Sequence, residues 1–213
     1  TISEQLFKEW ALRSVAIKPY PICHFNHAPV DAALELKQQH ALTPDKIESV
    51  TVLLDERQFG VVVNPIESKR VPQSEYDAKF SVPYAVATAL CKGQFGLADL
   101  EDEARLDAEV LALAQRVDCA HDERSHYPEA FSGGVSLTLK DGTRLEHFLT
   151  VNRGAEGQLL SADQVREKFL ANCGLTISNE SALATWDMLM QLDEVNNVTG
   201  LMALLRTEAN SAG

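Results

Sequence analysis

The segment that most constrains this chain is residues 16–36, AIKPYPICHFNHAPVDAALEL, in which a rigid turn joins two ordered stretches. The apolar run over residues 12–17 predicts the end of a strand. Two prolines then stiffen the backbone and remove two amide donors. Pro29 falls where the first turn of a helix tolerates proline, and apolar residues follow it at helical spacing. The sequence therefore predicts a strand end, a rigid turn and a helix over about 27–42.

Side chains capable of chemistry crowd into this turn. Lys18 precedes the prolines, and Cys23, His24 and His27 follow them. Unpaired N–H groups and the helix dipole make a helix start a natural site for an anion. Lys18 adds a full positive charge, and His27 adds a titratable donor. The turn is a candidate anion site, with a proline-stiffened loop carrying incidental histidines as the alternative.

A second ordered start of the same kind begins at Lys79. Ser81 is a good N-cap, and Pro83 falls in the first turn of the helix that it would cap. An alanine-rich apolar face follows, and Gly93 predicts the C-terminal end of this helix.

Two such starts, if they converge, suit a small di- or tricarboxylate. Positioned donors stabilise the enolate that forms when a proton leaves the carbon beside a carboxylate. Lys18, Lys79 and Ser81 are therefore candidate binding residues, together with Cys23 and His24. Lys18 is also a candidate catalytic residue, because it would hold the developing enolate. A general acid or base must complete the site, and His27 is the best candidate for it.

Composition excludes several classes of function. The 213 residues carry a formal net charge of −12, which argues against nucleic acid or an anionic membrane as a partner. The four cysteines include no CxxC pair, so a metal cluster has little support, and we expect no metal and no cofactor. Scattered cysteines and the lack of a signal peptide or membrane-length apolar run predict a cytoplasmic protein.

The rest of the chain alternates between helical and strand patterns. Strands are predicted over residues 47–54, 117–119, 135–139 and 145–151, and the last two flank a turn that is typical of a β-hairpin. A continuation of the first strand over 59–63, after a bend at Gly60, is also predicted. Residues 64–76 are expected to form an irregular loop. Residues 99–114 are expected to be helical, with an inner stripe of Leu106, Val110, Leu113 and Ala114.

Helices dominate the two ends of the chain. An amphipathic helix is predicted over residues 3–12, a capped helix from Ser161, and two further helices over 178–191 and 195–206. The pattern as a whole indicates an α+β fold, with helices around a small, mostly antiparallel sheet. We expect a lead-in helix and strand over 1–17, an α+β domain over 18–158 and a helical segment over 159–213.

Three motifs resemble the MmgE/PrpD family, in the order in which that family carries them. Lys18-Pro-Tyr-Pro-Ile-Cys23 followed by His27 resembles its K-x-y-P-x-c-x-x-x-H signature. The segment from Glu75 to Ala87, with Lys79-Phe-Ser-Val-Pro-Tyr84, is similar to its "a-K-F-S-l-p-Y-a-v-A" motif. Leu160-Ser161 with Lys168-Phe169 is similar to its "P-L-S-x-x-x-v-x-x-K-F" helix, although Leu159 replaces the usual proline.

The resemblance implies a metal-independent lyase or isomerase that acts on small polycarboxylates. The family includes 2-methylcitrate dehydratase, cis-aconitate decarboxylase and iminodisuccinate epimerase. Its fold has a large all-helical domain and a smaller α+β lid, with the active site in the cleft between them. Residues 18–151 match the lid, the helices from Ser161 match the return to the helical domain, and Lys18 and His27 match positions at the cleft.

One departure from the family matters for function. Its members are about twice this length, and their N-terminal helical half supplies further active-site residues. This chain is therefore expected to carry half a site, with the N-terminal helical half in the same polypeptide or in a partner chain, and to form a homodimer. Dehydration of a 2-methylcitrate-like substrate is the favoured activity. The alternatives are epimerisation, decarboxylation, or a non-catalytic role in oligomerisation or carboxylate binding.

Overall fold

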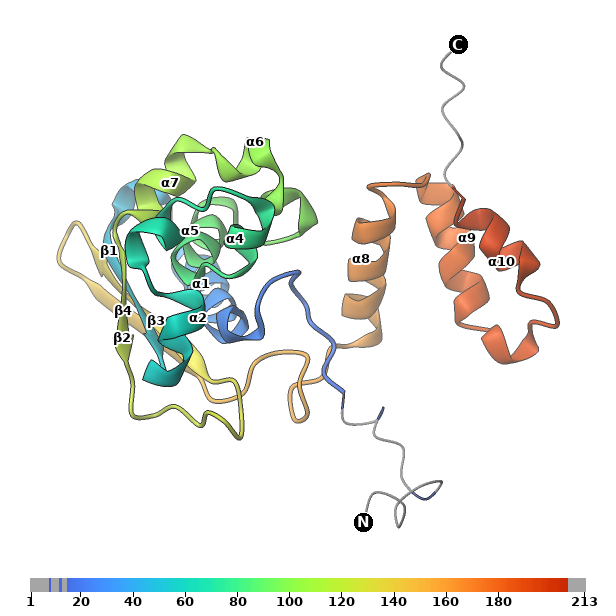
Figure 1. Ribbon diagram of the computed structural model, residues 1–213, viewed down its shortest axis with the longest axis horizontal. Coiled ribbons are helices and arrows are strands. Elements are labelled where there is room, and N and C mark those ends of the chain that lie inside the picture. Colours follow the sequence, from blue (N-terminus) through green and yellow to red (C-terminus); the bar gives the residue numbers. More distant parts are fainter. Residues whose placement is uncertain (1–7, 9–11, 13–14, 207–213) are drawn as a thin grey trace. The chain divides into compact units, whose positions relative to one another are not determined.

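A computed structural model describes Lys8, Leu12 and residues 15–206 of the chain. Within them the chain divides into two compact units, with the boundary between Leu159 and Leu160 (Figure 1). The helix predicted over residues 3–12 lies outside the described residues, except for Lys8 and Leu12. The assignment of residues 1–17, 18–158 and 159–213 to three functional segments stays a prediction.

A four-stranded mixed sheet forms one side of the first unit (Figure 1). Its order is β2-β1-β3-β4; β1 pairs with β2 in parallel and with β3 antiparallel, and β3 pairs with β4 antiparallel. The α+β prediction is therefore confirmed. The strands are β1 (Ile47–Leu54), β2 (Val117–His121), β3 (Gly133–Leu139) and β4 (Arg144–Leu149).

Alternation of side chains sets the register of the two central strands. Val50 pairs with Leu137 and Val52 pairs with Val135, and all four side chains are buried. Because side chains alternate between the faces of a sheet, these residues share one face, and helices cover it. The predicted hairpin is confirmed, and Gly142 at its turn has a φ of +87°, a conformation that glycine adopts without strain.

Two helices, α1 (His27–His40) and α5 (Val82–Lys92), pack together beside the sheet (Figure 1). Helix α1 ends as expected, with Ala41 in the left-handed conformation. Helix α5 also follows its prediction, because the Ser81 hydroxyl accepts a hydrogen bond from the Tyr84 amide and Gly93 adopts a φ of +72°.

The connection from β1 to β2 is more helical than the sequence pattern predicts. The strand predicted over 59–63 is wrong: residues 59–62 form helix α2 (Phe59–Val62). The physical reason is the Asp55 side chain, which accepts a hydrogen bond from the Arg57 amide and turns the chain into a 3₁₀ turn directly after β1. The predicted irregular loop at 64–76 is also wrong in part, because it contains α3 (Ile66–Arg70) and the start of α4 (Glu75–Lys79).

The helix predicted over 99–114 is broken in the middle. It consists of a 3₁₀ turn (Leu97–Leu100), α6 (Asp102–Arg105) and α7 (Ala108–Ala114). Asp107 starts α7 by accepting hydrogen bonds from two amides, so the chain changes direction before it. Leu106 lies at this break and is 62% exposed, which corrects its assignment to the inner stripe.

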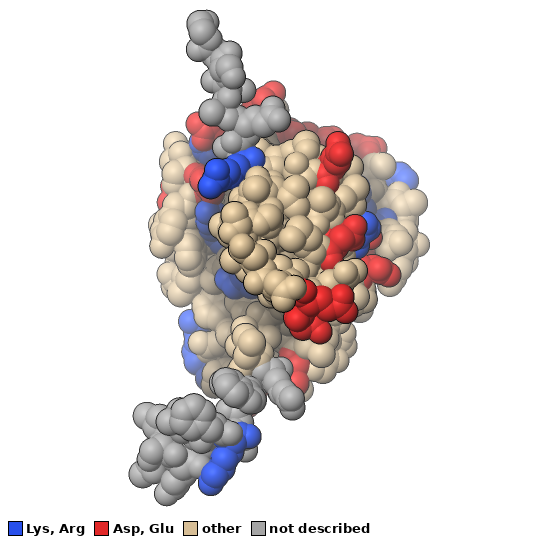
Figure 2. Space-filling view, turned by 90° about the vertical axis from the view of Figure 1, so that its right-hand side faces the viewer, with Lys and Arg blue, Asp and Glu red and all other residues tan. Residues whose placement is uncertain are grey.

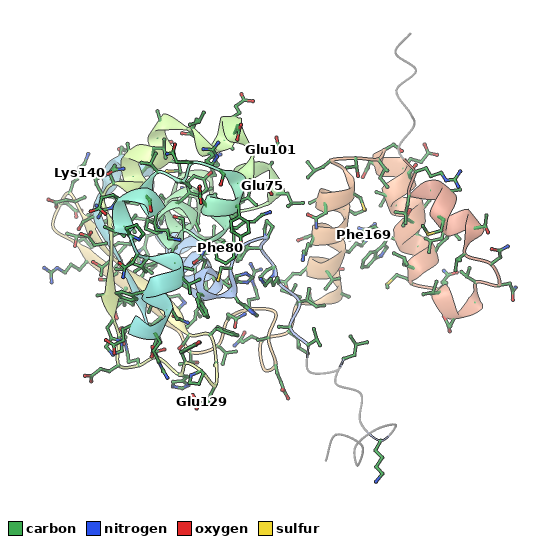
Figure 3. All side chains as sticks on the ribbon, in the orientation of Figure 1. Glu75, Phe80, Glu101, Glu129, Lys140 and Phe169 are labelled. Atoms are coloured by element: carbon green, nitrogen blue, oxygen red, sulfur yellow. The ribbon has the colours of Figure 1, made fainter. Side chains whose placement is uncertain are left out.

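In its described residues, 160–206, the second unit contains the α-helices α8 (Ala162–Cys173), α9 (Asn179–Leu189) and α10 (Thr199–Leu204). Ser161 and Gln164 form the predicted capping box of α8. Phe169 of α8 faces α9, and its ring centroid lies 5.4 Å from that of Trp186 (Figure 3). Helix α10 is shorter than predicted, since it begins only at Thr199, whose amide and hydroxyl both donate to the Asn197 side chain.

Within the described part of the chain, none of the helices combines the length and apolarity needed to cross a lipid bilayer.

Candidate functional site

The proline-rich turn lies against the loop that follows β4. Residues 15–18 form no strand, which corrects the predicted strand end; instead, the Ile17 amide donates to the carbonyl of Gly154 over 3.0 Å. A side chain at Gly154 would place its Cβ 2.0 Å from the carbonyl oxygen of Ile17. Glycine at this position therefore allows the two backbones to meet.

The two predicted helix starts converge on one cavity. The amide of Cys23 donates to the carbonyl of Lys79 over 2.8 Å, which joins the turn before α1 to the end of α4. An open cavity of about 650 Å³ lies at this junction, within the size range of small-molecule sites. It is lined by Lys18, Pro21, Ile22, Cys23, His24, Phe25, Tyr76, Lys79, Phe80 and Phe131.

Lys18 and Lys79 supply positive charge from the two sides of the junction. The ammonium of Lys18 donates to the Ile22 carbonyl over 3.1 Å, so its charge is held beside the turn. The ammonium of Lys79 lies 2.5 Å from Oε1 of Glu75, one helical turn earlier. A partly exposed ion pair of this kind is weak, so an anionic ligand can compete with Glu75 for Lys79. Figure 3 labels Glu75 and Phe80, which flank Lys79 in the sequence.

His24 lines the cavity and is held on two sides. Its ring stacks on Phe131, with centroids 4.6 Å apart and planes 21° apart, and its Nε2 lies 2.8 Å from Nδ2 of Asn152. Burial lowers the pKa of His24 below its ordinary value, and the charge of Lys18 lowers it further. The neutral imidazole is therefore favoured.

His27 lies one layer behind the cavity wall. It is fully buried, its Nε2 is 3.3 Å from the Ile22 carbonyl, and its ring centroid is 4.8 Å from that of His24. It does not line the cavity. Its assignment as the general acid or base stays a prediction. The prediction requires that a substrate can reach the His27 ring once the N-terminal helical half is in place.

Ser81 and Cys23 differ in their relation to the cavity. Ser81 is fully buried, does not line it, and uses its hydroxyl to accept from the Tyr84 amide and to donate to the Lys69 carbonyl. Cys23 lines the cavity, and burial raises the pKa of its thiol, partly offset by the amides of Phe25 and His24 and by Lys18. A neutral thiol is therefore favoured, which suits contact with the ligand better than proton transfer.

Sequence reasoning missed the aromatic wall of the cavity. Phe25, Tyr76, Phe80 and Phe131 line it, and Phe131 comes from the irregular segment between β2 and β3. That segment has no periodic pattern that would have marked it. Tyr76 and Phe80 are four residues apart, which places them on one face of a helix beside Lys79, and this spacing could have marked them in the sequence.

A buried network of polar side chains holds the proline-rich turn in place. The hydroxyl of Tyr20 donates to Oδ1 of Asp31 over 2.5 Å, and Nε of Arg153 donates to the same oxygen over 3.1 Å. Burial raises the pKa of Asp31, and the hydrogen bonds and positive charge of its partners oppose that rise. The network joins the turn, α1 and the loop after β4.

Among the described residues, no group of three or more His, Cys, Asp or Glu side chains is placed to hold a metal ion. The chemistry that these residues themselves offer is anion binding by two ammonium groups, and hydrogen bonding by His24.

Comparison with known proteins identifies the family of this chain. The family model for the MmgE/PrpD C-terminal domain matches residues 20–194. The chain belongs to the MmgE/PrpD family, which confirms the resemblance of its three motifs.

Two curated relatives are similar in sequence to this chain. Cis-aconitate decarboxylase of Mus musculus is 25% identical over 209 residues, which cover 92% of this chain and 41% of the relative. The 2-methylcitrate dehydratase of Escherichia coli K12 is 27% identical over 153 residues, covering 67% of this chain and 31% of the relative. The chain therefore spans less than half the length of these curated relatives.

Proposed function

We propose that residues 15–159 form the carboxylate-binding part of a lyase active site for a small di- or tricarboxylate. The observation that carries the proposal is the convergence of Lys18 and Lys79, from segments far apart in the sequence, on one cavity that His24 also lines. Two ammonium groups bind two carboxylates, and the aromatic wall accommodates the carbon skeleton between them.

The favoured reaction is dehydration of a 2-methylcitrate-like substrate. Removal of the α-proton places negative charge on the carboxylate side of the molecule, and Lys18, Lys79 and His24 stabilise that charge. The hydroxyl then leaves with a proton from an acid. His27 is our candidate for the α-proton base, acting together with groups of an N-terminal helical half. The names of the relatives support this class of reaction.

Decarboxylation is the second candidate, because a cis-aconitate decarboxylase matches 92% of this chain. Both reactions develop negative charge beside a carboxylate, so the cavity serves either of them. Assays of the complete enzyme with 2-methylcitrate and cis-aconitate separate the two, through loss of water or release of carbon dioxide.

The test of the carboxylate site is a titration with tricarballylate, a tricarboxylate without a hydroxyl to lose. We expect Lys18→Ala and Lys79→Ala each to weaken binding about tenfold or more, since a hydrogen bond to a charged group is worth about 1.5–3 kcal/mol. Lys140→Ala is the matched control, because Lys140 is exposed at the far end of the hairpin (Figure 3). Equal dissociation constants in all three variants would contradict the proposal.

The half-site also makes a prediction about turnover. We expect this chain alone to bind the tricarboxylate without converting 2-methylcitrate or cis-aconitate, and the complete enzyme to convert one of them. In the complete enzyme, Lys18→Ala should lower kcat/KM about 100-fold, and Lys140→Ala should leave it within about twofold. Turnover by the isolated chain would refute the division of the site.

A further inference from the structure

The loop after β4 carries a buried amide that touches the candidate site. Asn152 is 0% exposed, and its Nδ2 lies 2.8 Å from Nε2 of His24 and 3.1 Å from the carbonyl oxygen of Arg153. A carbonyl oxygen only accepts, so the nitrogen of the amide must face Arg153. The same nitrogen then donates its second hydrogen to Nε2 of His24, which must be the unprotonated nitrogen of that ring.

The position of the proton on His24 follows from this hydrogen bond. A neutral imidazole carries one proton, and an accepting Nε2 leaves that proton on Nδ1. The neutral form is favoured because burial lowers the pKa of His24, as does the nearby charge of Lys18. Stacking on Phe131 fixes the plane of the ring, and within residues 15–206 its Nδ1 makes no hydrogen bond.

Asn152 has little freedom to adapt, because the loop around it is held on both sides. The Gly154 carbonyl accepts from the Ile17 amide, and the Arg153 guanidinium donates to Asp31. The Oδ1 atom of Asn152 has no partner in the described part of the chain. Rotating the amide by half a turn would bury its NH₂ group without a partner. It would also place the Oδ1 atom of Asn152 against the carbonyl oxygen of Arg153. The orientation with Nδ2 toward Arg153 and His24 is therefore the stable one.

We propose that Asn152 is a positioning residue that holds His24 in the Nδ1–H tautomer, so that His24 offers a ligand in the cavity a hydrogen-bond donor. The nature of that ligand, a carboxylate or the enolate formed from it, rests on the proposed function. The tautomer does not, since it follows from contacts within this chain. In this arrangement His24 binds and stabilises negative charge, and proton abstraction belongs to another group.

The tautomer is measured directly by long-range ¹H–¹⁵N correlation spectra of the ¹⁵N-labelled chain, with His24 assigned from the spectrum of His24→Gln. We expect a pyrrole-type Nδ1 and a pyridine-type Nε2 at neutral pH. This is the reverse of the tautomer that a free histidine side chain prefers in water. A protonated Nε2 in the unmodified chain would overturn the proposal without any variant having to fold.

Two substitutions test whether Asn152 sets the tautomer. Asn152→Asp keeps the shape but can only accept, so His24 should move its proton to Nε2 or become doubly protonated. Asn152→Ala should return His24 toward the tautomer of the free side chain. Asn172→Asp, at an exposed position of α8, is the control and should leave the His24 spectrum unchanged. An unchanged tautomer in both Asn152 variants would overturn the proposal.

Binding of tricarballylate separates this inference from the proposed function. If His24 donates from Nδ1, Asn152→Asp should weaken binding about tenfold while the chain stays folded. A chain that shows the Nδ1–H tautomer but binds no tricarballylate would support the role of Asn152 and count against the carboxylate site. Full-strength binding by Asn152→Asp, with the tautomer reversed, would overturn the donor role of His24.

Discussion

The protonation of His24 is coupled to folding through its burial against Phe131. Its pKa is lowered from an ordinary value near 6.5, first by burial and then by Lys18. The unfolded chain therefore binds more protons at this position than the folded chain does. Stability is full above about pH 6.5 and falls as the pH decreases from there toward the lower pKa of the folded state.

Replacement of His24 should flatten this part of the stability profile. We compare the free energy of unfolding at about pH 7.5 and about pH 5.5. Between these two values it should fall more for the unmodified chain than for His24→Gln, by up to about 1 kcal/mol. The difference is small because His24 is partly exposed to solvent. Urea denaturation at the two pH values measures the difference. His40→Gln, at the exposed end of α1, should behave as the unmodified chain does. Parallel profiles for His24→Gln and the unmodified chain would show that His24 does not titrate in this range.

Gly154 is the residue whose size the turn depends on most. It has a φ of +88°, and a Cβ there would lie 2.0 Å from the carbonyl oxygen of Ile17. Gly157, three residues on, has a φ of +86° and nothing within 4 Å of its Cβ position. Both glycines have a backbone conformation that would be strained for any other residue, but only at Gly154 would a side chain also clash with a neighbouring atom.

We expect Gly154→Ala to lower the free energy of unfolding by about 3 kcal/mol or more, and Gly157→Ala by about 1 kcal/mol. The additional loss arises because the two backbones must separate, which also displaces Asn152 from His24. Urea denaturation measures the first effect, and the His24 spectrum measures the second. Equal losses for the two glycines would show that the turn moves away at little cost.

At the scale of elements, α5 begins at Ser81, the residue that links its N-terminus to the end of α3. The buried hydroxyl accepts from the Tyr84 amide and donates to the Lys69 carbonyl. Loss of both hydrogen bonds in Ser81→Ala should lower the free energy of unfolding by about 1–2 kcal/mol. Thermal denaturation measures this loss.

The same variant separates capping from ligand contact. Because Ser81 does not line the cavity, tricarballylate should bind Ser81→Ala as it binds the unmodified chain, at temperatures where both are folded. Weaker binding, of the size expected for Lys79→Ala, would show that Ser81 contacts the ligand, as the sequence predicts.

The elements that sequence predicts well are those whose signals are local. The hairpin depends on a turn and on alternating side chains, and α5 depends on Ser81 and Gly93, so both are where the pattern places them. Residues 59–63 have the β-branched composition of a strand but form α2, because the Asp55 side chain ends the strand before them. A side chain that captures a neighbouring amide overrides propensity, and hydropathy does not register it.

The candidate site divides in the same way. Its charged residues are visible in the sequence, since Lys18 and Lys79 stand beside helix starts. Their convergence depends on the hydrogen bond from Cys23 to Lys79, which no local pattern encodes. Asn152 and Phe131 come from irregular segments, and their roles arise only when those segments fold against His24.

At the scale of the whole molecule, the two units differ in how much apolar surface they bury. Nearly all buried hydrophobic residues in the described part belong to the first unit, and those of the second are Ala182 and Leu201. The second unit, although the smaller of the two, also exposes large apolar side chains. Figure 2, which looks onto this unit, shows a broad surface without charge beside a group of acidic side chains. The exposed residues are Leu175, Met190, Leu192, Val198, Met202 and Leu205.

A unit with so small a core should unfold before the first unit does, because stability scales with buried apolar area. Trp186 reports on it, since its ring lies 5.4 Å from Phe169 and the only other tryptophan, Trp10, can be replaced by phenylalanine. In the Trp10→Phe chain, we expect Trp186 fluorescence to change at a lower urea concentration than the circular dichroism of the first unit's sheet. Phe169→Ala should lower that first midpoint further, because the half-buried ring would lose about 1 kcal/mol of packing, and leave the second midpoint in place. Coincident transitions that shift together in Phe169→Ala would show instead that the two units fold as one.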